Sequence, residues 1–202
     1  MLNIQNIKIP GIQPINLSIA EGECVGVSGD SGCGKTRLLR AIVDMDEHEG
    51  DVFLGDKSML EFPGHTWRKN VCLVPAESQW WFDTIGEHFP EKVFDKFSTL
   101  FKTLGFERDV LSWQSARCSS GEKQRLAIIR AIINKPRVLL LDEPTTNLDA
   151  ENSRKVESLV SAYLKDNNAM VIWVGHNHAQ LKRVAINSYY TLSSNGLMKA
   201  AN

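Results

Sequence analysis

The chain has 202 residues, of which 43% are hydrophobic, and carries a formal net charge of −1 at pH 7. This length and composition predict one compact domain with a hydrophobic core, and the near-neutral charge argues against broad electrostatic binding to nucleic acid. The first residues carry no basic stretch followed by a long apolar run, and no window approaches about 18 consecutive apolar residues, so we expect neither a secretory signal nor a membrane-spanning helix.

The cysteines predict neither a structural zinc site nor a disulfide framework. Cys24, Cys33, Cys72 and Cys118 are scattered along the chain, and no two of them have the C-x-x-C spacing. This distribution favours a reducing compartment, where disulfides are rare.

Short strands are predicted at the start of the chain. Apolar and polar residues alternate over residues 3–9 and 15–19, and Pro10, Gly11 and Pro14 predict the turn between them. A tight turn at residues 20–23 then leads into residues 24–28, a short apolar run that is typical of a buried strand.

A phosphate-binding loop is predicted directly after this strand. Residues 29–36 read Gly29-Asp30-Ser31-Gly32-Cys33-Gly34-Lys35-Thr36 and fit the pattern G-x-x-x-x-G-K-S/T at every fixed position. Residues 35–43 have leucine and isoleucine at helical spacing, so the loop opens a helix whose N–H groups and dipole point at one place. The pattern predicts a triphosphate site in which Lys35 reaches the β- and γ-phosphates and the Thr36 hydroxyl binds Mg²⁺. The alternative, a glycine-rich turn that arose by chance, does not account for both flanking elements.

The pattern of apolar and polar residues changes in the middle of the chain. Residues 52–54 and 70–74 are predicted strands, and residues 76 to about 116 then show helical periodicity, with Trp80, Trp81 and Phe82 near the start. We interpret residues 76–130 as an inserted helical subdomain. The aromatic cluster is either the core of that subdomain or an exposed apolar patch that binds a partner.

The second half alternates helices and strands. Residues 119–134 predict an amphipathic helix, with Ser119 and Glu122 at the spacing of a capping box, and residues 138–141 predict a central parallel strand. A helix at residues 150–165, a buried strand at 170–174, a short helix at 179–184 and a last strand at 189–192 follow, with a hairpin turn before residues 197–199. This order predicts a single α/β domain over residues 1–202 with a mostly parallel central sheet.

Three polar side chains follow the predicted strands at the sheet edge where ligands bind in such folds. Asp142 is predicted to hold Mg²⁺, and Glu143 to orient and activate a water in line with the γ-phosphate. The alternative is that the acidic pair forms a solvated turn, which the phosphate loop upstream argues against. His176 is either a structural residue or a side chain that contacts the γ-phosphate.

A second helix start has the character of an anion site. Residues 118–122, Cys-Ser-Ser-Gly-Glu, open a predicted helix with small residues and a hydroxyl. One ATP does not easily use two such helices from one chain, whereas two facing chains could each supply one.

Together these residues resemble the nucleotide-binding domain of the ATP-binding cassette (ABC) family over essentially the whole chain. The loop at residues 29–36 matches the first phosphate motif, and Val-Leu-Leu-Leu-Asp-Glu-Pro at residues 138–144 matches the second motif with its catalytic glutamate. Residues 146–149 resemble the loop that crosses the dimer interface, and His176 occupies the switch-histidine position. Ser119 and Gly121 fall in the family signature, usually Leu-Ser-Gly-Gly-Gln.

The resemblance implies a P-loop NTPase fold with an N-terminal antiparallel β part, and a homodimer that holds two ATP molecules between one chain's phosphate loop and the other's signature helix. The implied nucleotide-binding residues are Gly29, Asp30, Ser31, Gly32, Cys33, Gly34, Lys35, Thr36, Arg37, Ser119, Gly121 and Asp149. Thr36 and Asp142 are implied to bind Mg²⁺, and Glu143 and His176 are implied to be catalytic.

The chain departs from the family pattern at several positions. Cys118 and Ser120 replace the first residue and the first glycine of the signature, and Ala76 stands where the family has a glutamine. No aromatic residue lies near residues 7–12 to stack on adenine. Cys33 and Cys118 are either ordinary small residues or a redox-sensitive pair that meets across the dimer.

The function implied by the resemblance is ATP hydrolysis that powers transport through a separate transmembrane permease, at the cytoplasmic face of the membrane. Trp80, Trp81 and Phe82 lie where the family docks that partner. The alternative is a soluble ABC protein that acts on nucleic acid or a ribosome, but such proteins usually carry coiled-coil insertions, tandem cassettes or basic extensions, and we expect no nucleic-acid partner. A small-molecule kinase with the same loop would not explain residues 119–125 or Asp149.

Overall fold

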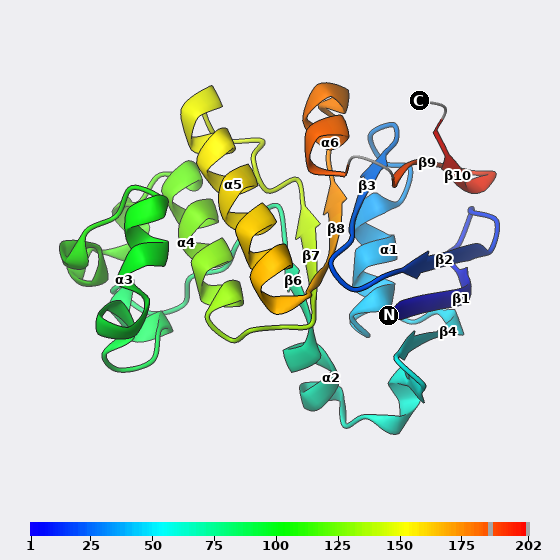
Figure 1. Cartoon of the computed structure of the whole chain (residues 1–202), viewed down its shortest axis with the longest axis horizontal. Coiled ribbons are helices and arrows are strands. Elements are labelled where there is room, and N and C mark those ends of the chain that lie inside the picture. Colours follow the sequence, from blue (N-terminus) through cyan, green and yellow to red (C-terminus); the bar gives the residue numbers. More distant parts are fainter. Residues whose placement is uncertain (186–187, 201–202) are drawn as a thin grey trace.

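The larger of two β-sheets organises the fold (Figure 1). The computed structural model describes residues 1–185 and 188–200. The sheet has the strand order β10-β9-β3-β8-β7-β6, in which β3 (Cys24–Ser28), β6 (Val71–Val74), β7 (Val138–Asp142), β8 (Met170–Val174) and β9 (Tyr189–Ser193) are parallel. Strand β10 (Gly196–Lys199) pairs antiparallel with β9. The carboxyl ends of the parallel strands therefore share one edge, where ligands bind in such sheets.

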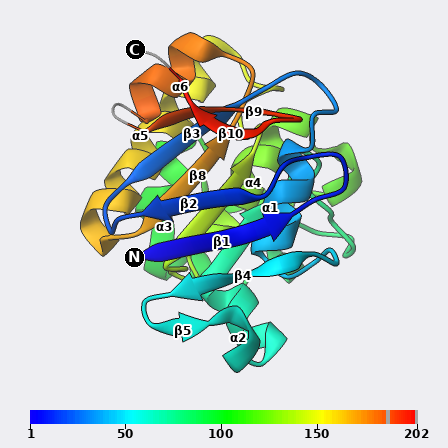
Figure 2. The ribbon, with the colours of Figure 1, turned by 90° about the vertical axis from the view of Figure 1, so that its right-hand side faces the viewer.

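The smaller sheet is antiparallel and confirms the predicted N-terminal β part. Its order is β2-β1-β4-β5, with β1 (Leu2–Lys8), β2 (Ile15–Ile19), β4 (Glu49–Leu54) and β5 (Lys57–Ser58). Figure 2 shows β1, β2 and β4 side by side, crossing the direction of β3 and β8.

The helices follow the predicted order, with one addition. They are α1 (Lys35–Ile42), α2 (Gly64–Asn70), α3 (Val93–Thr103), α4 (Ser120–Ile132), α5 (Ala150–Asn167) and α6 (His178–Val184). Short 3-10 turns occur at Met59–Glu61, Gly86–His88, Arg108–Ser112 and Ser115–Arg117. The predicted capping box is confirmed, because Ser119 and Glu122 bond reciprocally at the start of α4. Across residues 1–185 and 188–200, no helix combines the length and apolar character needed to cross a membrane.

The central strands contribute to a hydrophobic core on both faces of the sheet. Strands β7 and β8 are buried along their whole length. Leu139 and Val171 belong to one cluster, which includes residues of α3, α4 and α5, whereas Leu140 and Ile172 belong to the other, which includes residues of α1 and the antiparallel sheet. Because successive side chains of a strand point to opposite faces, these strands read as continuous apolar runs.

The helical region after residue 76 packs on the sheet through the first of these clusters. Phe101 and Val110 are fully buried there, and Trp80 packs against the same cluster. Trp81 and Phe82 are instead 65% and 45% exposed. The core interpretation therefore fits Trp80, and Trp81 and Phe82 are exposed as a patch requires. Partner binding at that patch and the subdomain boundary at 76–130 stay predictions.

Helix α2, like the two-residue strand β5, is an element that the sequence did not reveal. Asn70, expected to begin a strand, is the last residue of α2, and the strand begins at Val71. The helix has too few turns to show a periodic apolar face. Its Trp67 is fully buried, with Nε1 donating a hydrogen bond of 3.0 Å to the Ile42 carbonyl at the end of α1.

We expect Trp67→Ala to lower the free energy of unfolding by about 3–5 kcal/mol, because it leaves a large cavity and an unpaired Ile42 carbonyl. Urea unfolding followed by circular dichroism measures the change. Trp81→Ala is the matched control: its side chain is largely exposed, so its effect should stay within about 0.5 kcal/mol. Equal effects of the two changes would contradict the assignment of Trp67 to the core.

Candidate functional site

The loop between β3 and α1 is shaped by glycines with positive φ. Gly29 and Gly34 have φ values of 152° and 101°. A Cβ on Gly29 would lie 2.5 Å from the Leu192 carbonyl oxygen, and one on Gly34 would lie 2.6 Å from Cδ1 of Ile12. Both positions therefore favour glycine for conformation, and Gly29 also needs it for space, because its neighbour is backbone.

Lys35 lies at the centre of this loop. Its side chain is buried, and Nζ donates hydrogen bonds of 2.9 Å to the carbonyl oxygens of Gly29 and Asp30. No side chain of the described residues caps α1, in contrast to α4 and α5, which Ser119 and Asp149 cap. An ammonium group beside the N–H groups of an uncapped helix start is suited to bind phosphate.

Two oxygen donors meet at the end of the loop and fit a magnesium ion. The Thr36 hydroxyl donates a hydrogen bond of 2.8 Å to Oδ2 of Asp142, which joins α1 to the end of β7. Burial raises the pKa of Asp142, and the Thr36 hydrogen bond opposes that rise. The described residues hold no group of three or more His, Cys, Asp and Glu that could bind a metal by themselves. Mg²⁺ is commonly held by one or two protein oxygens together with water and phosphate, so this pair suits it.

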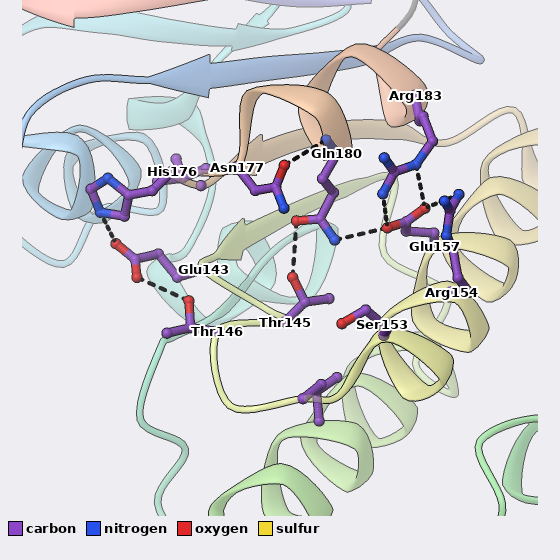
Figure 3. Close-up of a pocket in the computed structure, with 14 residues that line it drawn as sticks. Glu143, Thr145, Thr146, Ser153, Arg154, Glu157, His176, Asn177, Gln180 and Arg183 are labelled. Carbon is purple, nitrogen blue, oxygen red and sulfur yellow. Dashed lines mark hydrogen bonds and ion pairs between the residues drawn. The ribbon is translucent and has the colours of Figure 1, made fainter.

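Glu143 and His176 form a polar pair beside this site (Figure 3). Glu143 has a φ of 48°, in the left-handed region, and its N–H donates to the Val174 carbonyl at 3.0 Å. Its Oε1 lies 2.8 Å from Nε2 of His176, and its Oε2 accepts a hydrogen bond of 3.1 Å from the Thr146 hydroxyl. Two partners therefore hold the carboxylate in one orientation, as a general base requires.

Two cavities meet at His176. One of about 350 Å³ is lined by the start of the phosphate loop (residues 29–31), by His176 and His178, and by the end of β9. Another of about 470 Å³ is lined by Glu143, His176, the residues after Glu143, and parts of α5 and α6 (Figure 3). His176 therefore lies between the phosphate loop and Glu143, and the structure brings together Lys35, Thr36, Asp142, Glu143 and His176.

Three other predicted site residues contact other parts of the same chain rather than the phosphate loop. Among the described residues, no hydrogen bond or ion pair joins Ser119, Gly121 or Asp149 to the phosphate loop. Asp149 accepts a hydrogen bond of 2.7 Å from the Asn152 N–H, which lowers its pKa. A Cβ on Gly121 would lie 2.8 Å from the Asn147 carbonyl oxygen, so this glycine lets α4 pack on the loop before α5.

Cys118 does not have the surroundings of a reactive thiol. It is buried, its Sγ lies 3.6 Å from the Gln114 carbonyl oxygen, and burial raises its pKa. Redox-active thiols are accessible and have a lowered pKa. The geometry thus favours the interpretation of Cys118 as an ordinary small core residue.

A glutamine that the sequence analysis missed holds the loop around Ala76. Gln124 of α4 is buried, and its Nε2 donates a hydrogen bond of 3.1 Å to the Pro75 carbonyl. Its Oε1 accepts one of 3.1 Å from the Ser78 hydroxyl. Gln124 is 49 residues from Pro75 along the chain, so local sequence carries no signal for this contact.

Comparison with known proteins points to one family. A family model described as ABC transporter matches residues 12–146. The spermidine/putrescine import ATP-binding protein PotA of Legionella pneumophila (strain Paris) is 32% identical over 187 residues, which cover 85% of this chain and 50% of that protein. The lipoprotein-releasing system ATP-binding protein LolD 2 of Chlorobaculum tepidum is 31% identical, with coverage of 86% and 81%.

Solved structures share the fold. A dimeric ATP-binding cassette in a post-hydrolysis state, bound to ADP and Pi, has a TM-score of 0.79 and 22% identity, with both chains covered completely. An ATP-binding subunit of an ABC transporter has a TM-score of 0.86 and 20% identity, covering 98% of this chain and 88% of that one. The chain spans about half the length of the PotA relative.

Asp142 generates a prediction about stability and pH. Its pKa is raised by burial, so its contribution to stability is full below the unfolded-state pKa and is lost as the pH rises through the folded-state pKa. At neutral pH, we expect Asp142→Asn to unfold at a higher temperature than the unchanged protein. The rise should be about 2–4 °C for each kcal/mol by which the free energy of unfolding increases. The difference should shrink as the pH falls and vanish below about pH 3, where the carboxyl is protonated in both the folded and the unfolded state.

Thermal unfolding over a pH series, in the absence of divalent cations, measures this difference. The control is Asp56→Asn, since Asp56 is an exposed residue away from the site. A lower unfolding temperature for Asp142→Asn at neutral pH, or a difference that does not depend on pH, would contradict the prediction.

Proposed function

Because the chain belongs to the ABC transporter family, we propose that it binds and hydrolyses ATP and powers transport through a separate transmembrane permease. The observation that carries this proposal is the meeting of Lys35, the Thr36–Asp142 pair and the Glu143–His176 pair at one sheet edge. The names of the relatives, which are ATP-binding proteins of import and lipoprotein-release systems, support it.

Each residue has a distinct task in the proposed reaction. The N–H groups at the start of α1 and the Lys35 ammonium bind the β- and γ-phosphates. Thr36 and Asp142 hold Mg²⁺, which neutralises phosphate charge when bound. Glu143 accepts a proton from the attacking water, and His176 keeps the Glu143 carboxylate in place beside the γ-phosphate.

The proposed active unit is a homodimer with two ATP molecules at its interface. In the part of the chain that the structure describes, no hydrogen bond or ion pair joins the start of α4 to the phosphate loop of its own chain. Ser119, Gly121 and Asp149 would therefore act on the nucleotide held by the other chain. The N–H and hydroxyl of Ser119 each lie 2.8 Å from Oε2 of Glu122. A phosphate at this helix start would have to displace that carboxylate, because the two negative charges repel.

The membrane partner is proposed to dock on the exposed aromatic patch formed by Trp81 and Phe82. The N–H groups of both residues donate to Nε2 of His88, at 2.9 and 3.0 Å. Arg130 lies over the rings of Trp80 and Trp81, with 4.4 and 5.1 Å to the ring centroids. This scaffold presents two apolar rings to the outside, a feature typical of interaction sites. The chain would then be peripheral on the cytoplasmic face of the membrane.

The first test concerns Glu143. We expect Glu143→Gln to keep ATP affinity but to lower kcat by about 10²-fold or more, because the amide cannot take the proton from water. With ATP, this variant should accumulate as a dimer in size-exclusion chromatography. Lys35→Ala serves as the contrasting variant, since it should weaken nucleotide binding itself.

Two outcomes would contradict the proposed reaction. One is normal turnover by Glu143→Gln. The other is an unchanged protein whose turnover per chain stays constant down to concentrations at which it is strictly monomeric, because a shared site must lose activity on dilution.

The second test concerns the docking patch. We expect the double change Trp81→Ala, Phe82→Ala to lower the recovery of the tagged chain with cell membranes by about tenfold, roughly 1.4 kcal/mol of binding, and to leave its circular dichroism spectrum unchanged. Trp80 is left in place because it packs on the core. Leu60→Ala is the control, an exposed apolar residue on the 3-10 turn after β5. Undiminished membrane recovery, or recovery with RNA instead, would refute this docking role.

A further inference from the structure

Two sets of polar contacts, linked through the backbone into a ring, line the 470 Å³ cavity beside Glu143 (Figure 3). On one side, His176 contacts Glu143, and Glu143 accepts from Thr146. On the other side, the Thr145 hydroxyl donates a hydrogen bond of 3.0 Å to Oε1 of Gln180. Gln180 is four residues after His176 and Thr145 is two residues after Glu143, so this one bond closes the ring.

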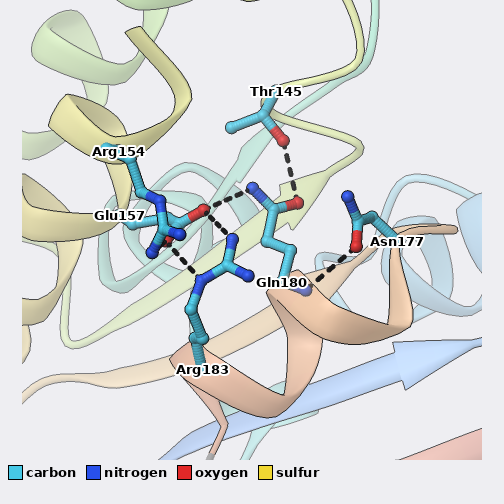
Figure 4. Close-up of polar contacts among 6 residues, drawn as sticks. All are labelled: Thr145, Arg154, Glu157, Asn177, Gln180 and Arg183. Atoms are coloured by element: carbon cyan, nitrogen blue, oxygen red, sulfur yellow. Dashed lines mark hydrogen bonds and ion pairs between the residues drawn. The ribbon is translucent and has the colours of Figure 1, made fainter. Parts of the chain in front are cut away.

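The amide of Gln180 is fixed in orientation by a buried carboxylate. Gln180 is 5% exposed, and its Nε2 donates a hydrogen bond of 2.9 Å to Oε1 of Glu157 (Figure 4). Since a carboxylate only accepts hydrogen bonds, the NH₂ group must face Glu157 and the oxygen must face Thr145. The backbone N–H of Gln180 also donates to Oδ1 of Asn177, at 3.0 Å.

Glu157 keeps its charge in this buried position. Burial raises its pKa, but hydrogen bonds from Arg183 and Gln180 outweigh burial and lower the pKa below its ordinary value. Arg183 donates at 3.2 and 2.9 Å, and Arg154 lies 3.6 Å away. A paired, ionised carboxylate is a rigid anchor, because losing either partner would leave a charge buried without compensation.

From this arrangement we propose that Gln180 and Thr145 are positioning residues for catalysis. Their hydrogen bond holds the segment that carries His176 against the segment that carries Glu143, and Glu157 keeps the Gln180 amide in the required orientation. The ring thereby sets the approach of His176 Nε2 to Glu143 Oε1. This inference rests on the proposed ATP hydrolysis, since it concerns the alignment of the same pair.

The variants are chosen to distinguish a loss of side-chain alignment at Glu143 and His176 from a loss of packing in the cavity. Thr145→Val keeps the shape of the side chain but removes the hydroxyl, whereas Thr145→Ser retains the hydroxyl. Gln180→Met has similar length and lacks both amide groups. Ser153→Ala is the matched control, because Ser153 lines the same cavity and makes no side-chain hydrogen bond within residues 1–185 and 188–200.

We expect Thr145→Val and Gln180→Met each to lower kcat about tenfold, with KM for ATP within about twofold, because misalignment of a base acts on the chemical step. The double change should be no slower than the slower single change, since both remove one bond. Thr145→Ser and Ser153→Ala should stay within about twofold of the unchanged protein in kcat.

A second measurement uses the protein without nucleotide. The imidazole resonances of His176, assigned by their loss in His176→Gln, should shift in Thr145→Val and return towards their original positions in Thr145→Ser. Ser153→Ala should leave them unchanged. Thermal unfolding of every variant shows whether it remains folded at the temperature of measurement.

The outcomes distinguish this inference from the proposed function. One outcome refutes the positioning role and leaves the proposed function standing. In it, the unchanged protein hydrolyses ATP, and both Thr145→Val and Gln180→Met retain its kcat and its His176 resonances. A rise in KM that matches the loss of activity, or equal losses in Ser153→Ala, would also refute it. If the unchanged protein does not hydrolyse ATP but the His176 resonances shift as expected, the ring stands and the proposed function fails.

Discussion

The hydrogen bond between Thr36 and Asp142 depends on the strand order and, in turn, locates the site. Thr36 belongs to the helix after β3 and Asp142 ends β7, while β8 lies between these two strands. The contact therefore spans the width of the central strand. Because β8 ends at the same edge, its own continuation brings His176 to the gap, where it reaches Glu143. A different order of the same strands would separate these four side chains.

The turn at Glu143 directs two adjacent acidic side chains to different partners. Asp142 continues the strand and is buried against Thr36. Glu143 adopts a positive φ, which costs a non-glycine residue about 1–3 kcal/mol, and its side chain turns towards His176. The turn is held by the Glu143 N–H to Val174 and by the Thr146 N–H to the Glu143 carbonyl. Strain of this size persists only because the surrounding contacts over-determine the conformation.

Buried polar groups tie the edges of the site to the rest of the fold. Gln124, Glu157 and Gln180 are each buried, and each has hydrogen-bond partners from another segment. Since an unmatched buried polar group costs about 1–3 kcal/mol, these contacts specify one arrangement of the loops rather than several. These contacts, rather than the conformational preferences of the loop residues themselves, hold the loops around Ala76, Glu143 and His176 in place.

Local sequence determined most of the elements and the candidate residues of the site. The phosphate loop, the apolar runs of β7 and β8, the capping box of Ser119 and the place of Asp142 and Glu143 at a strand end rest on periodicity, glycine spacing and residue type, which are properties of neighbouring residues. Tertiary structure alone decided helix α2, the packing of Gly121 on Asn147, the Gln124 contact and the bond between Thr145 and Gln180. These contacts join residues 25–49 positions apart, and only packing of the sheet and its helices brings such partners within hydrogen-bonding distance.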